Sequence, residues 1–468
     1  MRADGYSLGP YLFIDIKIEA HMSTSDDFSR EGSLAAPTRH PLAWREPDFY
    51  AENKLMTELE RVFDICHGCR RCFNLCHAFP TLFDAIDASS TLELDGVDKK
   101  VYWEVVDHCY LCDMCFMSKC PYVPPHEWNV DFPHLMLRAK AVKFNQGKTV
   151  LRDKILANTD AIGQIAAKPV VAPLVNWVNR NSVVRRINQS LLGLHPEALL
   201  PPFNSNSFSK RSVSQSVFTD PRAGKDSRHK VLIFSTCYGK YNEPDLVADL
   251  VNILHHNKVA VAVLAQEQCC GMPRLELGDF AAIEKSKTFN VEQLQPWVEE
   301  GWQIMAPVPS CVLMFKQELP LIFPEDNVVQ RIQQAILDPF QFLLELHKQG
   351  ALNTQFKNPL GKISYHVACH LRVQNIGLKT KEVLQLVPNT QVDAIERCSG
   401  HNGTYAVKVE FHKISMKIGK PVVNRVEQAN ADHYSSDCPM AGHQIENGLR
   451  NGKIPEHPLR LLRHAYGI

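Results

Sequence analysis

Three things are missing from this sequence: an excess of charge, a long apolar run and a glycine-rich nucleotide loop. Fifty-one basic residues balance 51 acidic ones, whereas proteins that coat nucleic acid carry a basic excess. No window reaches the ~18 uncharged apolar residues of a membrane-spanning helix. No G-x-G-x-x-G loop and no recognisable nucleophile–base set occurs. We therefore expect no nucleic-acid partner, no transmembrane helix, no bound NAD or FAD, and no catalytic residue in this chain.

Cysteine is the residue that is abundant. The 468-residue chain holds 15 cysteines in an otherwise ordinary soluble composition, with 45% hydrophobic and 22% charged residues. An odd number of cysteines, clustered at two-residue spacings, makes a poor disulfide framework and a good set of metal ligands. Asp15 and Lys17 interrupt the apolar stretch at 11–14 far short of a signal-peptide core, so we expect a cytoplasmic protein with reduced thiols. Met22 opens a polar segment, and residues 1–21 are either a tail or a consequence of start-site choice.

The C-terminal half alternates short β-rich runs with amphipathic helical stretches, which is typical of a parallel α/β sheet. Strands are predicted at 231–235, 259–264 and 303–308, and again at 363–367, 391–395 and 433–436, with helices at 245–256 and 381–386. The first three strands lead to Cys237, Cys269-Cys270-Gly271 and Cys311, and the last three to Cys369, Cys398-Ser399-Gly400 and Cys438. The positions 237, 269 and 311 are 32 and 42 apart, and 369, 398 and 438 are 29 and 40 apart. The pattern indicates an internal duplication.

The cysteines of this duplicated region all follow the carboxyl ends of predicted strands. Ligands bind at that edge of an open α/β sheet, because strand ends and helix N-termini converge there. We therefore expect Cys237, Cys269, Cys270 and Cys311 to converge as metal ligands, and Cys369, Cys398 and Cys438 to form a second, less complete set. The alternative is that they are free buried cysteines that act as small hydrophobic residues.

Two further motifs lie in the helix-prone N-terminal region. They read Cys66-x2-Cys69-x2-Cys72-x3-Cys76 and Cys109-x2-Cys112-x2-Cys115-x4-Cys120-Pro121. Three closely spaced cysteines plus a distant fourth is the bacterial ferredoxin arrangement, in which the fourth cysteine binds the other cluster. The spacing predicts two [4Fe–4S] clusters, one bound by Cys66, Cys69, Cys72 and Cys120 and the other by Cys109, Cys112, Cys115 and Cys76. A pair of zinc sites is the alternative, but zinc leaves the third cysteine of each motif unexplained.

These signals divide the chain into five segments. We predict an N-terminal tail at 1–51, a helical two-cluster ferredoxin-like domain at 52–145, and a helical connector with a Ser-rich linker at 146–229. A first cysteine-rich α/β domain follows at 230–350, and a second, degenerate copy at 351–468. The fold class is therefore an α-helical ferredoxin domain followed by a duplicated α/β domain with short parallel sheets.

The two motifs, with segments CHGCRRC at 66–72 and CYLCDMC at 109–115, followed by a duplicated Cys/Cys-Cys-Gly/Cys pattern, resemble the heterodisulfide reductase-related iron–sulfur proteins. That group includes the iron–sulfur subunits of anaerobic glycerol-3-phosphate dehydrogenase and of glycolate oxidase. The likeness covers roughly residues 52–448. The helix-prone flank at 55–63 also resembles the helical ferredoxin of fumarate reductase iron–sulfur subunits.

The resemblance implies that each cysteine-rich repeat has five cysteine ligands and can bind a non-cubane iron–sulfur cluster. By this comparison Val308 replaces one ligand of the first copy, and Ser399 and Ser435 replace two of the second. The first copy is expected to hold one further cluster. The second would need His366, His370 or His401 to complete its set, and each of these histidines has the alternative of an ordinary structural role.

A chain with clusters and no flavin needs an electron donor and an acceptor on other molecules. The resemblance implies an electron-transfer subunit that takes electrons from a flavoprotein dehydrogenase, oxidising glycerol 3-phosphate or a 2-hydroxy acid, and passes them towards quinone or a membrane-bound partner. A heterodisulfide reductase-like thiol/disulfide oxidoreductase subunit is one alternative. A soluble electron donor to another redox protein, with the duplicated domain a degenerate scaffold, is the other.

The connector carries one more pattern. Segment 162–194 sets Val170, Val171, Leu174, Val175, Trp177 and Val178 beside Arg180, Arg185 and Arg186. A helix with an apolar face and a basic flank can lie in a membrane interface, and we predict such a helix after Pro173 because Pro169 and Pro173 interrupt the earlier part. A partner-docking face and a plain core helix remain the alternatives. The protein is thus expected to be cytoplasmic or peripheral on the inner face of the membrane.

Overall fold

The computed structural model describes residues 37–118 and 120–468. Residues 1–36, which include most of the predicted tail and the polar segment after Met22, lie outside the described residues, as does position 119.

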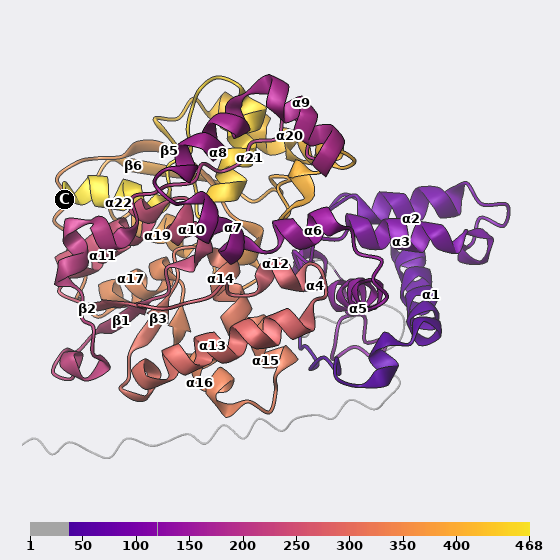
Figure 1. The fold of residues 1–468 in the computed structure, drawn as a ribbon, viewed down its shortest axis with the longest axis horizontal. Helices are drawn as coiled ribbons and strands as arrows, with labels where there is room; N and C mark the ends of the chain where they lie inside the picture. The colour runs from indigo at the N-terminus through magenta and orange to yellow at the C-terminus, as the bar shows by residue number, and fades with distance from the viewer. Residues whose placement is uncertain (1–36, 119) are drawn as a thin grey trace, which may run out of the picture.

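The N-terminal part is helical (Figure 1). Its helices are η1 (Pro47–Tyr50), α1 (Glu52–Cys69), α2 (Ala78–Asp87), η2 (Leu94–Gly96), α3 (Lys99–His108), α4 (Met114–Ser118) and α5 (Phe132–Asn145). In α1 the buried residues Leu55, Leu59, Val62 and Phe63 fall on one face, as the helical repeat requires. The predicted helical region is therefore confirmed.

The connector is also helical, with α6 (Leu151–Leu156), α7 (Thr159–Ala166), α8 (Val171–Arg180) and α9 (Ser182–Leu192), followed by the short helices η3 (Phe208–Lys210), η4 (Ser212–Ser216) and η5 (Pro221–Gly224). Helix α8 begins at Val171, before Pro173, and so three residues earlier than the sequence predicts. A proline is tolerated in the first turn because the backbone N–H that it lacks would have no partner there.

The first α/β unit has a parallel four-stranded sheet in the order β2-β1-β3-β4. Its strands are β1 (Lys230–Ile233), β2 (Ala260–Val263), β3 (Gln303–Met305) and β4 (Ile336–Leu337). Its helices are α10 (Thr236–Tyr241), α11 (Pro244–His256), α12 (Met272–Leu275), α13 (Phe280–Glu299), α14 (Pro309–Leu313), the π-helix η6 (Met314–Glu318), α15 (Leu319–Ile322), α16 (Asn327–Ala335) and α17 (Pro339–Lys348).

The second unit repeats the plan with a parallel sheet in the order β6-β5-β7. Its elements are β5 (Gly361–His366), α18 (Cys369–Arg372), α19 (Lys379–Leu384), β6 (Thr390–Ile395), η7 (Tyr405–Val407), α20 (His412–Ala429), β7 (His433–Ser436), α21 (Pro439–Leu449) and α22 (Pro458–Tyr466). The predicted repeat with short parallel sheets is thus confirmed. The C-terminal helix α22 crosses back to pack on α11 of the first unit.

Alternate residues of β1 face two different cores. Leu232 packs in the core that also contains the N-terminal helices, whereas Val231 and Ile233 pack in the core shared with the second sheet. A strand that is buried on both faces reads as a continuous apolar run, and the sequence Val231-Leu232-Ile233-Phe234 has this form. The first sheet therefore joins the helical region to the second repeat, and the cysteine motifs of all three parts are held at fixed positions.

Candidate metal centres

The first N-terminal motif gathers its cysteines at the end of α1. Cys66 and Cys69 occupy the last turn of the helix, and Arg70 takes a left-handed conformation that ends it. Burial, followed by the neighbouring thiols of Cys120, Cys72 and Cys69, raises the pKa of Cys66. The distant Cys120 of the second motif is therefore a neighbour of the first motif, as the ferredoxin-like spacing predicts.

The second motif follows α3. The cysteine that it receives from the first motif is Cys76. Burial and the adjacent Cys109 thiol raise the pKa of Cys76 to about 12. The pKa of Cys115 is also raised by burial, with Cys112, Cys109 and Cys76 among the interacting thiols. The loop between them uses positive φ angles at Leu111 and Asp113. The structure thus brings Cys76 to the second motif, although the ligand assignment itself stays a prediction.

The first cysteine-rich repeat brings its four cysteines into mutual contact beyond the sheet. The thiols of Cys237 and Cys270 hydrogen-bond to Cys269, and these bonds hold the pKa of Cys269 well below its usual value. Cys270 also hydrogen-bonds to Cys311. Gly271 follows at φ 102°, a backbone conformation that disfavours a side chain. The structure thus brings the four thiols together, although their role as metal ligands stays a prediction.

Three buried polar atoms near these thiols have no hydrogen-bond partner in the described part of the chain: Thr159 Oγ1, Tyr241 Oη and Glu267 Oε1. Electrostatic interactions join Tyr241 to Cys237 and Glu267 to Cys269. Burial raises the pKa of Glu267 to about 8. Buried polar atoms without such a partner are uncommon in folded proteins. Four convergent thiols with these polar atoms around them fit a bound iron–sulfur group.

The second repeat is sparser. Cys369 begins α18, Cys398 follows β6 and Cys438 caps α21. Burial raises the pKa of Cys369, with Cys398 and Cys438 as the interacting thiols. The two serines that stand where further ligands would be serve the fold: Ser435 is fully buried within β7 and donates to the Glu456 carbonyl, and Ser399 Oγ accepts from a backbone N–H.

Two of the three histidines near that repeat are occupied by protein partners. His366 uses both ring nitrogens, Nδ1 with Ser436 Oγ at 2.9 Å and Nε2 with the Arg397 carbonyl at 3.0 Å. His370 Nδ1 lies 2.8 Å from Ser310 Oγ, and His370 also hydrogen-bonds to the backbone of Leu111. His370 therefore bridges both repeats and the second N-terminal motif.

The cysteine groups follow one another through the molecule. Cys112 of the second motif interacts with Cys369 and Cys398 of the second repeat. Cys438 of that repeat interacts with Cys311 of the first repeat. Since Cys115 also interacts with Cys72, all four groups form one continuous series.

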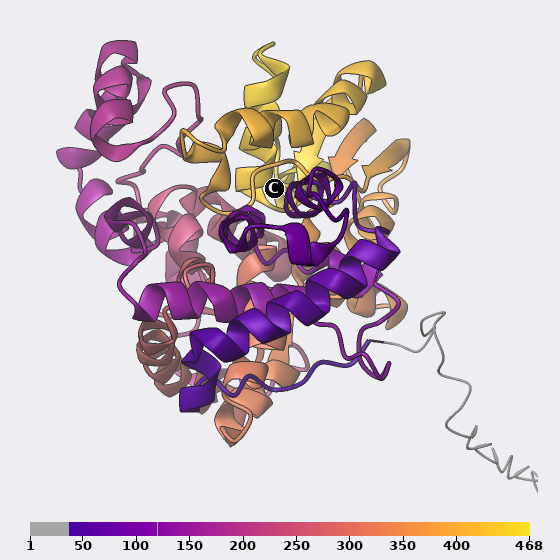
Figure 2. The same cartoon turned by 90° about the vertical axis from the view of Figure 1, so that its right-hand side faces the viewer.

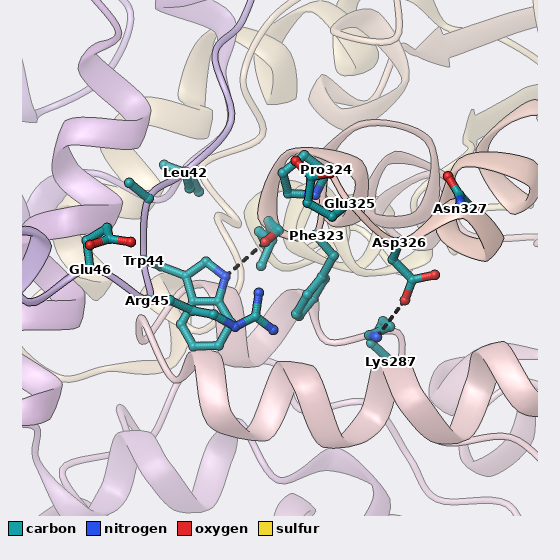
Figure 3. Close-up of a pocket in the computed structure, with 12 residues that line it drawn as sticks. Leu42, Trp44, Arg45, Glu46, Lys287, Phe323, Pro324, Glu325, Asp326 and Asn327 are labelled. Atoms are coloured by element: carbon teal, nitrogen blue, oxygen red, sulfur yellow. Dashed lines mark hydrogen bonds and ion pairs between the residues drawn. The ribbon is translucent and has the colours of Figure 1, made fainter.

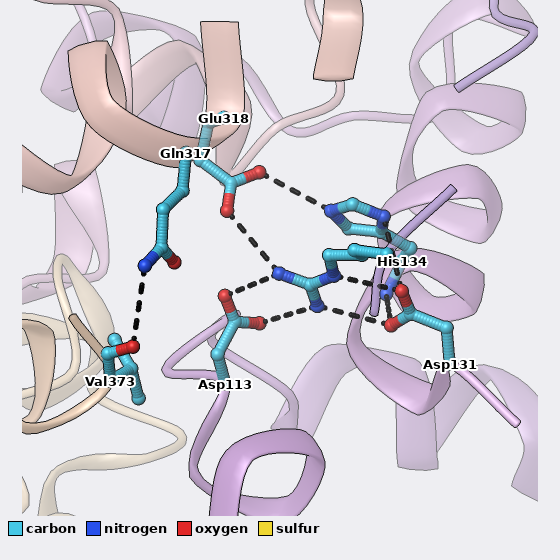
Figure 4. A network of polar contacts seen from close by, with 7 residues as sticks. Asp113, Asp131, His134, Gln317, Glu318 and Val373 are labelled. Carbon is cyan, nitrogen blue, oxygen red and sulfur yellow. Dashed lines mark hydrogen bonds and ion pairs between the residues drawn. The ribbon is translucent and has the colours of Figure 1, made fainter. Parts of the chain in front are cut away.

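A buried ionic network beside the second motif is a feature that the sequence does not indicate (Figure 4). Arg39 donates to Asp113 at 2.8 and 3.0 Å and to Asp131 at the same two distances. Its Nη1 lies 3.4 Å from Glu318 of η6, and His134 lies 3.3 Å from the same carboxylate. The nearby His134, together with the guanidinium, holds the pKa of Asp131 at about 2 against the opposing effect of burial. Residues 37–46, the N-terminal strap, are thereby tied to both the helical region and the first repeat.

The same strap lines a pocket of about 560 Å³ at the surface (Figure 3). Trp44 stacks on Phe280 at 5.2 Å and donates to the Ile322 carbonyl at 2.9 Å. Lys287 closes the other side through its ion pair with Asp326 at 2.8 Å. None of the 15 cysteines lines this pocket, so it is separate from the candidate centres.

Within the described part of the chain, no three Cys, His, Asp or Glu side chains have the arrangement that one metal ion requires. A zinc site places its ligands about 2.0–2.3 Å from a single ion, whereas the four cysteines of a cubane surround four irons. In the same residues, no helix is long and apolar enough to cross a membrane.

The repeated sheets with cysteines at their strand ends match a described family of protein domains. A family model described as a cysteine-rich domain, CCG, matches residues 231–316 and 363–446. The chain therefore carries two CCG cysteine-rich domains.

The chain is also similar in sequence to several individual proteins. It is 28% identical over 339 residues to a subunit of the anaerobic glycerol-3-phosphate dehydrogenase of Escherichia coli K12, covering 72% of this chain and 82% of that protein. It is 21% identical over 418 residues to a subunit of the fumarate reductase (CoM/CoB) of Methanothermobacter marburgensis, covering 85% and 72%. Lactate utilization protein A of Lysinibacillus sphaericus matches at 26% over 197 residues, 40% of this chain and 82% of that protein. The chain is homologous to this glycerol-3-phosphate dehydrogenase subunit and to heterodisulfide reductase-related iron–sulfur proteins.

Proposed function

We propose that this chain is the iron–sulfur electron-transfer subunit of a dehydrogenase complex. It relays electrons from a flavoprotein that oxidises glycerol 3-phosphate or a 2-hydroxy acid towards quinone. The observation that carries the proposal is the continuous series of cysteine groups, from the first motif through the second motif and the second repeat to the first repeat. The similarity to a glycerol-3-phosphate dehydrogenase subunit and to a lactate utilization protein supports this choice of donor.

The residues proposed to hold the cofactors are the cysteines of the two motifs and of the first repeat. Cys66, Cys69, Cys72 and Cys120 hold one [4Fe–4S] cluster and Cys109, Cys112, Cys115 and Cys76 the other, while Cys237, Cys269, Cys270 and Cys311 hold a further iron–sulfur group. When bound, such clusters supply one-electron transfer at potentials set by burial and hydrogen bonding. Five of these twelve cysteines are buried and the other seven are partly buried.

The proposed boundaries are the five segments predicted from the sequence, with 52–145 as the ferredoxin-like domain and 230–350 and 351–468 as the two repeats. Residues 37–46 of the proposed tail act as the N-terminal strap, because Arg39 and Trp44 are anchored on the body of the protein. In this proposal the second repeat lies between the second motif and the first repeat, and electrons pass through it. Its cysteines Cys369, Cys398 and Cys438 are left with low ligand capacity, since Ser435 and His366 are committed to protein hydrogen bonds.

A heterodisulfide reductase-like activity has less support. It needs complete ligand sets at the repeats, and Val308, Ser399 and Ser435 leave both copies short by comparison with the five-cysteine pattern. A soluble donor to another redox protein shares the same cysteine groups and differs only in the acceptor. The exposed apolar helices of the connector support an acceptor at the membrane, and we propose a peripheral location for that reason.

Anaerobic purification with iron analysis and electron paramagnetic resonance (EPR) tests the proposal. We expect about twelve irons per chain for two cubanes and a further four-iron group, and about eight if the first repeat holds none. Affinity purification from the native host should retain a flavin-containing chain, and glycerol 3-phosphate or a 2-hydroxy acid should then bleach the visible spectrum of the complex. A preparation with iron but without any flavin partner, which none of these substrates reduces, contradicts the proposed donor. Fewer than about eight irons in an anaerobically reconstituted chain contradicts the two-cluster assignment.

A further inference from the structure

We propose that helix α7 of the connector is part of the first cysteine-rich site, and that Thr159 is a positioning residue whose hydroxyl donates a hydrogen bond to the sulfurs of Cys237 and Cys269. The inference rests on the proposed function in one respect: it takes the first repeat to hold an iron–sulfur group. It goes further in assigning to that site a residue from outside both repeats.

The contacts at the N-terminal turn of α7 carry the proposal. The Thr159 side chain interacts with both thiols, and its buried Oγ1 has no hydrogen-bond partner among the described residues, which leaves its hydroxyl proton free to be donated to a sulfur. The next residue, Asp160, accepts the backbone N–H of Cys269 through Oδ2. Two consecutive residues of the connector therefore contact the same pair of cysteines. Thr159 lies at the sulfurs and Asp160 binds the backbone.

Helix α7 is seated on the helix that carries Cys237. A Cβ added to Gly163 would lie 2.2 Å from Cδ2 of Tyr241, the last residue of α10. Gly163 and Ala166 are the buried residues of α7. Only a glycine permits so close an approach of the α7 backbone to the tyrosine ring. The register of α7 on α10 is therefore fixed, and with it the position of Thr159 over the thiols.

Val308, at the N-cap of α14 beside Cys311, offers no polar side chain. A threonine hydroxyl supplies one hydrogen-bond donor. A donor to a ligand sulfur stabilises the more negative, reduced form of a cluster and raises its reduction potential. The hydroxyl is neutral, so it tunes the site without adding a buried charge.

Four variants of the full-length chain, purified anaerobically, test the assignment, and the first three concern threonines. Thr159→Val removes the hydroxyl at nearly constant volume, Thr159→Ser keeps it, and Thr288→Val makes the same change at an exposed position of α13, where the hydroxyl bonds only to the Glu284 carbonyl. The readout is a dye-mediated redox titration followed by EPR. It resolves the two ferredoxin-type signals from the signal of the first repeat.

We expect Thr159→Val to shift the midpoint potential of the first-repeat signal downwards and to leave the two ferredoxin-type signals unmoved. Thr159→Ser and Thr288→Val should match the wild type. Gly163→Ala, which lifts α7 from Tyr241, should reproduce the downward shift. An unchanged potential in Thr159→Val, or an equal shift in Thr159→Ser, overturns the proposal. So does a wild-type chain with about eight irons and no third signal, an outcome that leaves the proposed electron-transfer function standing. A wild-type chain without ferredoxin-type signals, by contrast, defeats the proposed function.

Discussion

A buried charged side chain, that of Arg39, fixes the N-terminal strap to the rest of the protein. Arg39 comes from a polar, Pro-punctuated stretch that has no periodicity, yet its side chain is only 10% exposed and its guanidinium lies 4.4 Å from the Phe116 ring. Its partners come from loops and helices far along the chain. A buried ion pair is weak evidence for stability as such, but removing one partner leaves uncompensated charges in the interior.

We therefore expect Arg39→Met to be strongly destabilising. It leaves the carboxylates of Asp113 and Asp131 without their bidentate partner, and breaking a buried pair of this kind costs about 3–5 kcal/mol. Urea unfolding followed by circular dichroism measures the loss. Arg45→Met is the matched control, because the Arg45–Glu284 pair is exposed on both sides and such pairs contribute about 0–1 kcal/mol. Equal effects of the two variants would show that the network does not hold the strap.

A second residue couples the two repeats and makes stability depend on pH. His443 of α21 lies 2.7 Å from Glu446 and 3.1 Å from Glu243, which caps α11 in the first repeat. Although burial alone would lower it, the two carboxylates raise the pKa of His443 to about 9. The stabilisation is therefore fully present below about pH 6.5, the ordinary value for histidine, and is lost as the pH rises through about 9.

His443→Gln should remove this dependence. At about pH 6.5 we expect a loss of roughly 2–3 kcal/mol, and at about pH 9.5 the variant and the wild type should be nearly equal in stability. Chemical denaturation across this pH range gives the comparison, with His464→Gln, an exposed position in α22, as the control. A difference between His443→Gln and wild type that stays constant over the whole range contradicts the assigned pKa.

Most elements of the duplicated domain can be predicted because each strand is a short apolar run that ends at a cysteine. The predicted strands at 231–235 and 433–436 match β1 and β7 closely. Strand β4 has two residues, too few for any period to register. The sequence does not predict helix α20, which contains Pro421 and Gly419 and has a mixed composition. The Cys398 loop packs closely against it because Gly400 and Gly419 have no side chain at the contact.

The connector is where sequence reasoning fails on a specific residue. The sequence pattern puts Arg185 on the basic flank of an interfacial helix, but Arg185 is 5% exposed and donates to the carbonyls of His195, Pro196 and Ala198. Those carbonyls belong to a turn that no local pattern could reveal. The N-terminal motifs, by contrast, can be predicted from the sequence, because the spacing of their cysteines indicates which of them can converge.

The exposed face of α8 and α9 remains the candidate for membrane contact. Figure 2 shows these helices at the edge of the molecule, and Leu174, Trp177, Val183, Ile187 and Leu191 are each more than half exposed. From 161 to 196 the sequence contains no Asp or Glu, while Arg180 and Arg186 are exposed. An apolar face with a basic surround adds hydrophobic to electrostatic attraction at an anionic bilayer.

We expect the purified chain to pellet with liposomes that contain anionic lipid and to pellet less with neutral ones. Leu174→Glu with Trp177→Glu should abolish pelleting, because two charges then enter the apolar face. Ile454→Glu, which also changes an exposed apolar residue but lies in the second repeat, should pellet as the wild type does. If the wild type stays in the supernatant with both lipids, this face docks a protein partner instead.

At the scale of the whole molecule, the cysteine groups are shared between segments. Cys120 lies with the first motif and Cys76 with the second, so each N-terminal site depends on residues that are far apart in sequence. The same holds at the next boundary, where Cys438 of the second repeat interacts with Cys311 of the first. Each N-terminal site therefore draws on both motifs, and the cysteine groups of the two repeats meet at their boundary.

Because each site takes cysteines from both motifs, variants in different motifs should have the same effect on one EPR signal. Cys120→Ser should weaken or remove the same EPR signal as Cys66→Ser, and Cys76→Ser the same signal as Cys109→Ser, because each pair contributes sulfurs to one group and the loss of one thiolate ligand lowers the occupancy of a four-cysteine cluster. The untouched signal of each variant serves as its internal control, since a general failure to fold removes both. Iron analysis should show a loss of about four irons in each variant. If Cys120→Ser instead shares its phenotype with Cys109→Ser, each motif is closed on itself. The exchange of Cys76 and Cys120 is then wrong, even though the spacing of the two motifs would still predict two clusters.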